Sequence, residues 1–176
     1  MFLDSPGLAD FHQERPFIQY IIDHSDLILF IIDDAIGYGS KEQEILQYIM
    51  RAGKKDHTIV IANKLDIKRK EREYATAIAD YYSLGFPGVV GVSALKEIAL
   101  HEIQDAMQSI VDKTPVLQKK LQKEEKKSSA ISFAVVGKPN AGKSTLLNTF
   151  VGSYVSKVED KAGTTRDYIE SSFIYD

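Results

Sequence analysis

The chain has 176 residues, which suffices for one sizeable α/β domain with a core but not for two complete ones. Charged residues make up 27% and hydrophobic residues 44%, with a net charge of -3, a balance that excludes a disordered chain and identifies no partner. The lack of cysteine excludes disulfides, thiolate zinc sites and cysteine nucleophiles, and it fits a reducing compartment, so we expect a cytoplasmic protein.

Short apolar runs alternate with longer segments that suit helices. The strand candidates are 27–32, 58–62 and 88–92, and the helix candidates are 40–51, 70–82 and 98–112. The strand candidates are apolar throughout, so we expect helices to cover both of their faces. The alternation predicts an α/β fold, a three-layer sandwich with a mostly parallel sheet. None of these runs approaches the roughly 20 residues that cross a bilayer, and no secretory signal is visible, so no membrane association is expected.

The composition changes at 113–130, where the sequence KTPVLQKKLQKEEKKSSA is rich in lysine and poor in large apolar residues. This segment is typical of a charged linker, although its first half could equally be a solvated helix that extends the preceding one. A strand candidate at 131–136, a helix candidate at 144–151 and a last strand candidate near 168–175 follow. No internal repeat is visible.

The strongest motif lies between that strand and that helix, where GKPNAGKS fits the phosphate loop G-x-x-x-x-G-K-[ST]. Gly137 and Gly142 would let the backbone wrap a phosphate with its amide groups, Lys143 would place a charge on the β- and γ-phosphates, and the Ser144 hydroxyl would bind magnesium. An ordinary glycine-containing turn is the alternative. The predicted nucleotide-binding residues here are Gly137, Lys138, Pro139, Asn140, Ala141, Gly142, Lys143, Ser144 and Thr145.

A second motif, Asn63-Lys64-Leu65-Asp66, follows the strand candidate 58–62 at the end where parallel sheets bind ligands. The Asp66 carboxylate can accept hydrogen bonds from the ring N–H and the exocyclic amine of guanine, which adenine cannot supply at those edges. The motif therefore indicates guanine nucleotide, with Asn63, Lys64 and Asp66 as binding residues. A solvated loop is the alternative for this common tetrapeptide.

Three weaker motifs accompany these two. Ser93-Ala94-Leu95 ends the strand candidate 88–92, and its alternative is a simple helix cap. The segment DSPG, with Asp4 and Gly7, fits D-x-x-G but also an ordinary Pro-Gly turn. The segment GTTRD at 163–167 follows the phosphate-loop helix, and its threonines could instead bond their own backbone.

Other polar residues offer less. The four histidines have no metal-ligand spacing, and we interpret them as surface or structural residues. The acidic pair Asp33-Asp34 is interpreted as a strand terminus, although its first carboxylate could orient nearby loops.

The five motifs together resemble those of the translation-factor-related GTPases, most closely the tandem-domain bacterial ribosome-assembly family called Der or EngA. The segments that carry this resemblance beyond the motifs are YSLGF at 82–86, GKPNAGKSTLLN at 137–148 and AGTTRDYIES at 162–171. The resemblance implies hydrolysis of GTP to GDP and phosphate in the biogenesis of the large ribosomal subunit. It also implies ribosomal particles or ribosomal RNA as partners.

The same resemblance assigns roles to the weaker motifs. A backbone amide of Ser93-Ala94-Leu95 would reach the guanine carbonyl oxygen. Asp4 would hold magnesium through water, the Gly7 amide would sense the γ-phosphate, and Thr165 would complete the magnesium shell. Because Leu8 stands where Ras-like proteins have a water-orienting glutamine, the resemblance implies a potassium ion held by Asn140. The expected catalytic residues are Lys143, Asn140 and Thr165.

The motifs occur in a permuted order, with the phosphate loop after the base motif. On the resemblance, 1–113 correspond to the later part of a first GTPase domain, 114–130 to the charged linker and 131–176 to the beginning of a second. Each motif occurs once, so we hypothesise that the chain closes into one permuted domain or exchanges halves with a second copy in a homodimer.

Two alternatives stay open. One is a truncated fragment with little activity of its own. The other is a nucleotide-gated module that interacts with ribosomal RNA or ribosomal proteins, with catalysis incidental. Its basic patch would be the lysines of the linker, at 119, 120, 123, 126 and 127, although glutamine and glutamate interrupt them and favour a solvated linker.

Overall fold

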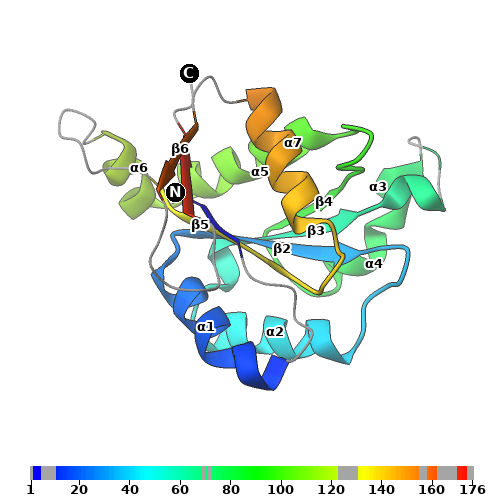
Figure 1. The fold of residues 1–176 in the computed structure, drawn as a ribbon, viewed down its shortest axis with the longest axis horizontal. Coiled ribbons are helices and arrows are strands. Elements are labelled where there is room, and N and C mark those ends of the chain that lie inside the picture. The colour runs from blue at the N-terminus through cyan, green and yellow to red at the C-terminus, as the bar shows by residue number, and fades with distance from the viewer. Residues whose placement is uncertain are drawn as a thin grey trace.

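A computed structural model of the chain describes residues 2–4, 11–68, 70, 73–122, 131–154, 158–161 and 170–173. One seven-stranded sheet forms its centre, in the order β4-β3-β2-β5-β1-β7-β6 (Figure 1). The strands are β1 (Phe2–Asp4), β2 (Leu27–Asp33), β3 (Thr58–Asn63), β4 (Gly88–Gly91), β5 (Phe133–Gly137), β6 (Val158–Lys161) and β7 (Glu170–Phe173).

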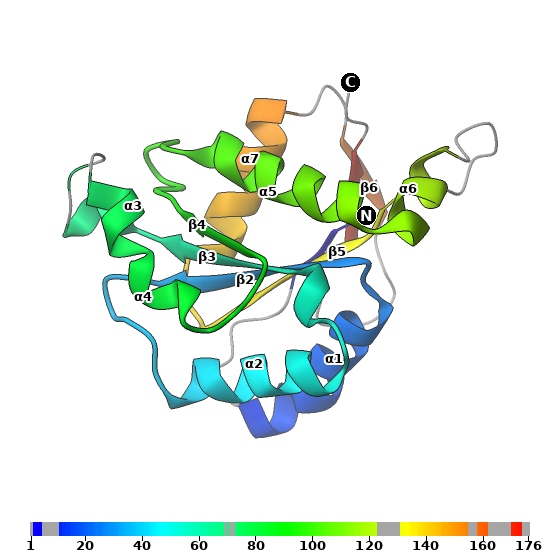
Figure 2. The same cartoon turned by 180° about the vertical axis from the view of Figure 1, so that it is seen from behind.

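Helices cover both faces of the sheet, as the views from the front and from behind show (Figures 1 and 2). Buried side chains of the first four helices pack on one face and those of the last three on the other. The first group is α1 (Phe11–His24), α2 (Ser40–Arg51), α3 (Tyr74–Ala77) and α4 (Ala79–Tyr82). The second group is α5 (Leu100–Lys113), α6 (Pro115–Gln122) and α7 (Lys143–Tyr154). The expected three-layer α/β architecture is confirmed.

The two cores follow from the two-residue period of the strands. In β2, Ile28 and Phe30 belong to the cluster on the α1–α4 side, whereas Leu29 and Ile31 belong to the cluster on the α5–α7 side. All four are at most 3% exposed. The strands therefore need continuous apolar runs, because a strand that alternated apolar and polar residues would place its polar side chains in one of the two cores.

Strands from distant parts of the chain share this sheet. The late strand β5 lies between β2 and β1, and all three run parallel. Strands β3 and β4 continue the parallel part, while β7 pairs antiparallel with β1 and β6 pairs antiparallel with β7. Because Asp33 is opposite Asn63 and Ile31 is opposite Gly137, the loops that follow β2, β3 and β5 start at the same edge of the sheet.

Several elements differ from the sequence expectation. The helix expected over 70–82 is two short helices, α3 and α4, that meet at Ile78. The first half of the lysine-rich segment is the helix α6, which docks on the sheet through Leu117, 2% exposed. The elements α1, β1 and β6 were not expected. Within the described ranges, no helix has the length and apolar character needed to span a membrane.

Candidate nucleotide-binding site

Two glycines shape the loop at the end of β5, because neighbouring groups leave no room for a side chain at either position. A Cβ on Gly137 would lie 2.4 Å from the Ile31 carbonyl oxygen. Gly142 has φ +93°, and a Cβ there would lie 2.3 Å from the Asn63 side-chain nitrogen. Asn140 also has a left-handed backbone, with φ 61°. The chain then enters α7 at Lys143, so the loop opens onto a helix N-terminus, where anions are favoured.

Lys143 is folded back over this loop. Its ammonium donates to the carbonyl oxygens of Gly137 at 3.1 Å and Lys138 at 3.0 Å, and the residue is only 6% exposed. Ser144 and Thr145 follow in the first turn of α7 and are exposed. A buried cation at a loop of this shape is suited to bind a phosphate group.

The base motif contacts the phosphate loop directly. Asn63, 2% exposed at the end of β3, donates from its amide nitrogen to the Ala141 carbonyl at 2.8 Å. Its amide oxygen accepts the Ala94 backbone N–H at 3.0 Å. The Lys64 ammonium donates to the Asn140 carbonyl oxygen. Three of the motifs are thereby brought together at one edge of the sheet.

Asp66 lies in the 3-10 turn η2 (Leu65–Ile67), beside the end of β4. A hydrogen bond from Ser93 lowers the pKa of the Asp66 carboxyl, burial opposes this, and Lys96 at 3.3 Å lowers it further. Ser93 and Ala94 are buried, whereas Leu95 is 80% exposed. The carboxylate is thus held in its charged form, the form that accepts hydrogen bonds from guanine.

Curated relatives match most of the length of this chain. The GTPase Der of Persephonella marina is 34% identical over 160 residues, which cover 90% of this chain and 34% of that protein. The GTPase Der of Thermoanaerobacter pseudethanolicus is 34% identical over 166 residues, 94% of this chain and 35% of that protein. Nearly the whole chain is thus similar to part of GTPase Der. A family described as 50S ribosome-binding GTPase matches residues 132–176.

The resemblance to Der seen in the sequence is therefore confirmed. The chain spans about a third of the length of these Der relatives.

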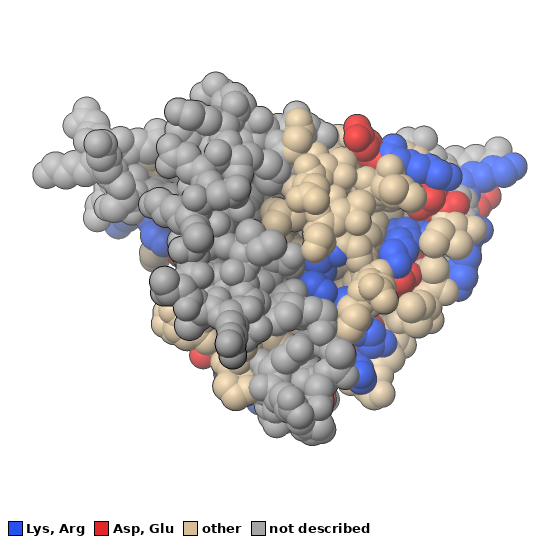
Figure 3. Space-filling view, in the orientation of Figure 1, with Lys and Arg blue, Asp and Glu red and all other residues tan. Residues whose placement is uncertain are grey.

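Two carboxylates outside the motifs contact residues of the candidate site, Asp33 from the end of β2 and Glu42 from α2. The sequence offered only Asp33, as a residue that could orient nearby loops. Glu42, 1% exposed in α2, pairs with the Lys138 ammonium at 2.6 Å and accepts the Gly39 backbone N–H at 3.0 Å. Asp33 pairs with Lys64 at 2.7 Å. Neither contact has a local sequence signal, because each partner lies far along the chain. Among the coloured residues on the right of Figure 3, lysine and arginine side chains lie with acidic ones between them.

Other expected Der site residues are less completely described. Asp4 ends β1, opposite Val135 of the parallel strand β5, so its backbone lies at the edge that carries the phosphate loop. Gly7, Leu8 and the segment 163–167 with Thr165 lie outside the described residues. Within the described ranges, no group of three His, Asp or Glu side chains could hold a metal ion.

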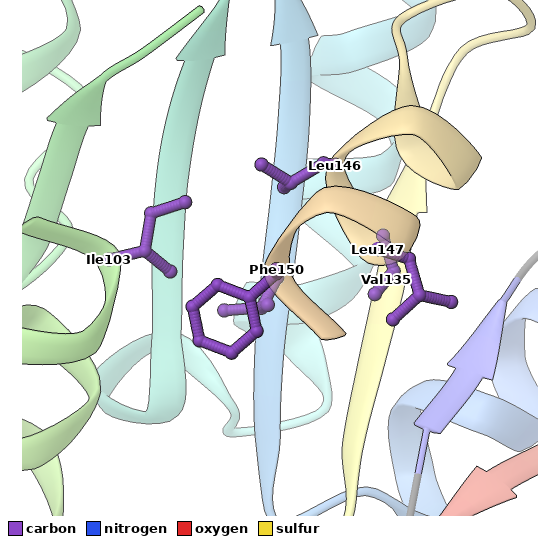
Figure 4. Close-up of a pocket in the computed structure, with 6 residues that line it drawn as sticks. Ile103, Val135, Leu146, Leu147 and Phe150 are labelled. Carbon is purple, nitrogen blue, oxygen red and sulfur yellow. The ribbon is translucent and has the colours of Figure 1, made fainter. Parts of the chain in front are cut away.

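A small cavity lies away from these loops, beneath α7 (Figure 4). Its volume is about 10 Å³, enough for about one water molecule. Its lining is entirely apolar: Leu29, Ile103, Val135, Leu146, Leu147 and Phe150. It is a packing gap in the core and no part of the candidate site.

Proposed function

We propose that the chain binds guanine nucleotide and hydrolyses GTP to GDP and phosphate at a site formed by the phosphate loop and the Asn63–Asp66 turn. The observation that carries this proposal is the pair of hydrogen bonds from Asn63 and Lys64 to the carbonyls of Ala141 and Asn140. A single nucleotide has to place its base at the Asn63–Asp66 turn and its phosphates at the phosphate loop. The two motifs must therefore lie side by side, and their hydrogen bonds hold them in that arrangement.

The donors and acceptors fit such a ligand. The Lys143 ammonium would turn from two loop carbonyls toward the phosphates, and the Asp66 carboxylate would accept from the guanine ring. Magnesium would neutralise phosphate charge and would be held by Ser144 with Asp4 and Thr165. The full set of proposed contacts is that expected from the sequence: 137–145, Asn63, Lys64, Asp66, Ser93–Leu95, Asp4 and Gly7.

Turnover would depend on charge neutralisation rather than on a glutamine. We propose that Asn140 holds potassium and that Lys143 and Thr165 stabilise the phosphate charge as it develops. Phosphate release should then be faster in potassium chloride than in sodium chloride at equal ionic strength. Equal rates in the two salts would remove the potassium role and leave the nucleotide site as proposed.

The cellular role extends the same proposal. In a Der-like role in the cytoplasm, the bound nucleotide would control binding to particles of the large ribosomal subunit. The description of the matching family as 50S ribosome-binding GTPase supports this proposal. In that setting, 1–113 and 131–176 would be the later part of one GTPase domain and the beginning of another, joined by 114–130. A half-exchanged homodimer stays a further proposal, and light scattering of the purified chain would test it.

Titration with a fluorescent GDP analogue tests the site. Lys143→Met removes an ammonium that would make at least two charge-assisted bonds of about 1.5 kcal/mol each, so affinity should fall roughly 100-fold. Lys54→Met is the matched control, because Lys54 is half-buried and its ammonium also donates to a carbonyl, that of Ser25 at 2.8 Å. Equal affinities of Lys143→Met and wild type would contradict the proposal.

A further inference from the structure

Two adjacent carboxylates at the end of β2 have different partners. Asp33 and Asp34 are 6% and 7% exposed. Asp33 accepts the Lys64 ammonium at 2.7 Å through one oxygen and the Ala35 backbone N–H at 3.0 Å through the other. Asp34 accepts the Tyr81 hydroxyl at 2.9 Å, in the core on the α1–α4 side. Neighbours in sequence with similar burial therefore serve different parts of the molecule.

Lys64 connects Asp33 to the phosphate loop. Its ammonium donates to the Asp33 carboxylate and to the Asn140 carbonyl oxygen at the same time. Both Lys64 and Asn140 have a left-handed backbone, with φ of 66° and 61°. Such conformations persist in non-glycine residues only where the surroundings hold them. The carboxylate, the ammonium and the carbonyl thus link the loops that follow β2, β3 and β5.

The bridge depends on its carboxylate. The Asp33 side chain is 7% exposed and that of Lys64 is 31% exposed, so the pair is only partly screened by water. Without the negative charge, the Lys64 ammonium would keep one carbonyl partner and gain freedom to turn into solvent. The phosphate loop would then lose a contact that fixes it beside the base motif.

We propose that Asp33 is a positioning residue for the nucleotide site: acting through Lys64, it holds the phosphate loop in its binding shape and slows nucleotide escape. This inference rests on the proposed function. Asp33 reaches the phosphate loop through Lys64 and is not one of the proposed base contacts, so it should change the dissociation rate more than the choice of base.

The test is dissociation of a fluorescent GDP analogue, chased with excess GDP, from the whole chain. Asp33→Asn should dissociate about three- to tenfold faster, the effect of weakening one charge-assisted hydrogen bond. Asp34→Asn, the matched control, should stay within about twofold of wild type, a change of less than about 0.5 kcal/mol. In a Lys64→Met background, Asp33→Asn should add less than about twofold, because the residue through which it acts is gone.

Each result decides the question. If Asp33→Asn releases the analogue at the wild-type rate, the inference is overturned. It is also overturned if Asp34→Asn accelerates release as much as Asp33→Asn does. The same holds if Asp33→Asn keeps its full effect in the Lys64→Met background. If Asp33→Asn does not fold, Lys64→Met alone carries the test, and a wild-type rate there overturns the inference. A wild-type chain that binds no GDP analogue would overturn the proposed function and this inference with it.

Discussion

The two ends of the parallel strands use the same residue types for different purposes. At the carboxyl ends, Asp33, Glu42 and Asp66 pair with lysines of the loops around the candidate site. At the amino ends, Asp26 pairs with Lys120 at 2.6 Å and accepts the backbone N–H and the hydroxyl of Ser132, each at 2.8 Å. Both clusters join the early part of the chain to residues far along it.

The difference lies in the backbone that each cluster holds. At the carboxyl ends, the bonded loops include Lys64, Asn140 and Gly142, all with positive φ. At the amino ends, Asp26 ties the start of β2 to the residue before β5, where Asp26 and Ser132 also bond through their backbones. We therefore expect substitutions at the first edge to change nucleotide binding and those at the second to change stability.

The largest expected effect is that of Asp66→Asn on guanine affinity. The amide cannot accept both hydrogen bonds that the carboxylate would accept, each of about 1.5–3 kcal/mol, so affinity for GDP should fall by about two to four decades. Titration with a fluorescent GDP analogue measures this loss.

The control for Asp66→Asn is the same variant with xanthosine diphosphate. Xanthine has a carbonyl in place of the exocyclic amine of guanine, and the new asparagine can donate to it. Binding of the xanthine nucleotide should therefore improve while binding of GDP is lost. A parallel loss for both nucleotides would mean that the variant damages the loop and that Asp66 does not read the base.

Much of the site could be predicted because its residues stand in short, fixed patterns. The phosphate loop and the Asn63–Asp66 turn each occupy a few consecutive residues after an apolar strand, so pattern and context agreed. The pairs Glu42–Lys138 and Asp33–Lys64 could not be predicted, because they depend on which strands become neighbours in the sheet.

The fold shows the same limit. The expected helix over 40–51 matches α2, and the apolar runs match β2, β3 and β4 to within a residue or so. Helix α1 was missed because Pro16 interrupts its pattern, although the helix continues through it. Strand β1 has only three residues, and β6 is mostly charged, so neither contains an apolar run that would indicate a strand.

A smaller effect, on stability, is expected from Asp26→Asn. Asparagine keeps one acceptor oxygen but loses the charge that Lys120 and Ser132 contact, so the free energy of unfolding should fall by about 1–2 kcal/mol. Urea denaturation measures the loss, and GDP affinity should stay within about twofold of wild type, less than about 0.5 kcal/mol. A large loss of affinity with unchanged stability would contradict the division between the two edges.

The pH dependence of unfolding sharpens this expectation. Burial raises the pKa of Asp26, but the hydrogen bonds from Lys120 and Ser132 outweigh it and leave the pKa below its ordinary value. A group with a lowered folded-state pKa stabilises the protein above the unfolded pKa of roughly 4, and this stability is lost as the pH falls through the folded value. The stability difference between wild type and Asp26→Asn should therefore shrink as the pH falls below about 4.

The smallest expected effect is that of Lys120→Met. The Lys120 side chain is 40% exposed, and such ion pairs contribute about 0–1 kcal/mol, so stability should fall by less than about 1 kcal/mol. Lys119→Met, a neighbouring exposed lysine, should change nothing measurable in urea denaturation. The Lys120 hydrogen bond is the largest of the contacts that lower the pKa of Asp26, so much of the acid dependence should be lost in Lys120→Met. A loss of stability as large as that of Asp26→Asn would mean that the lysine, and not the contact with Ser132, holds the two parts of the chain together.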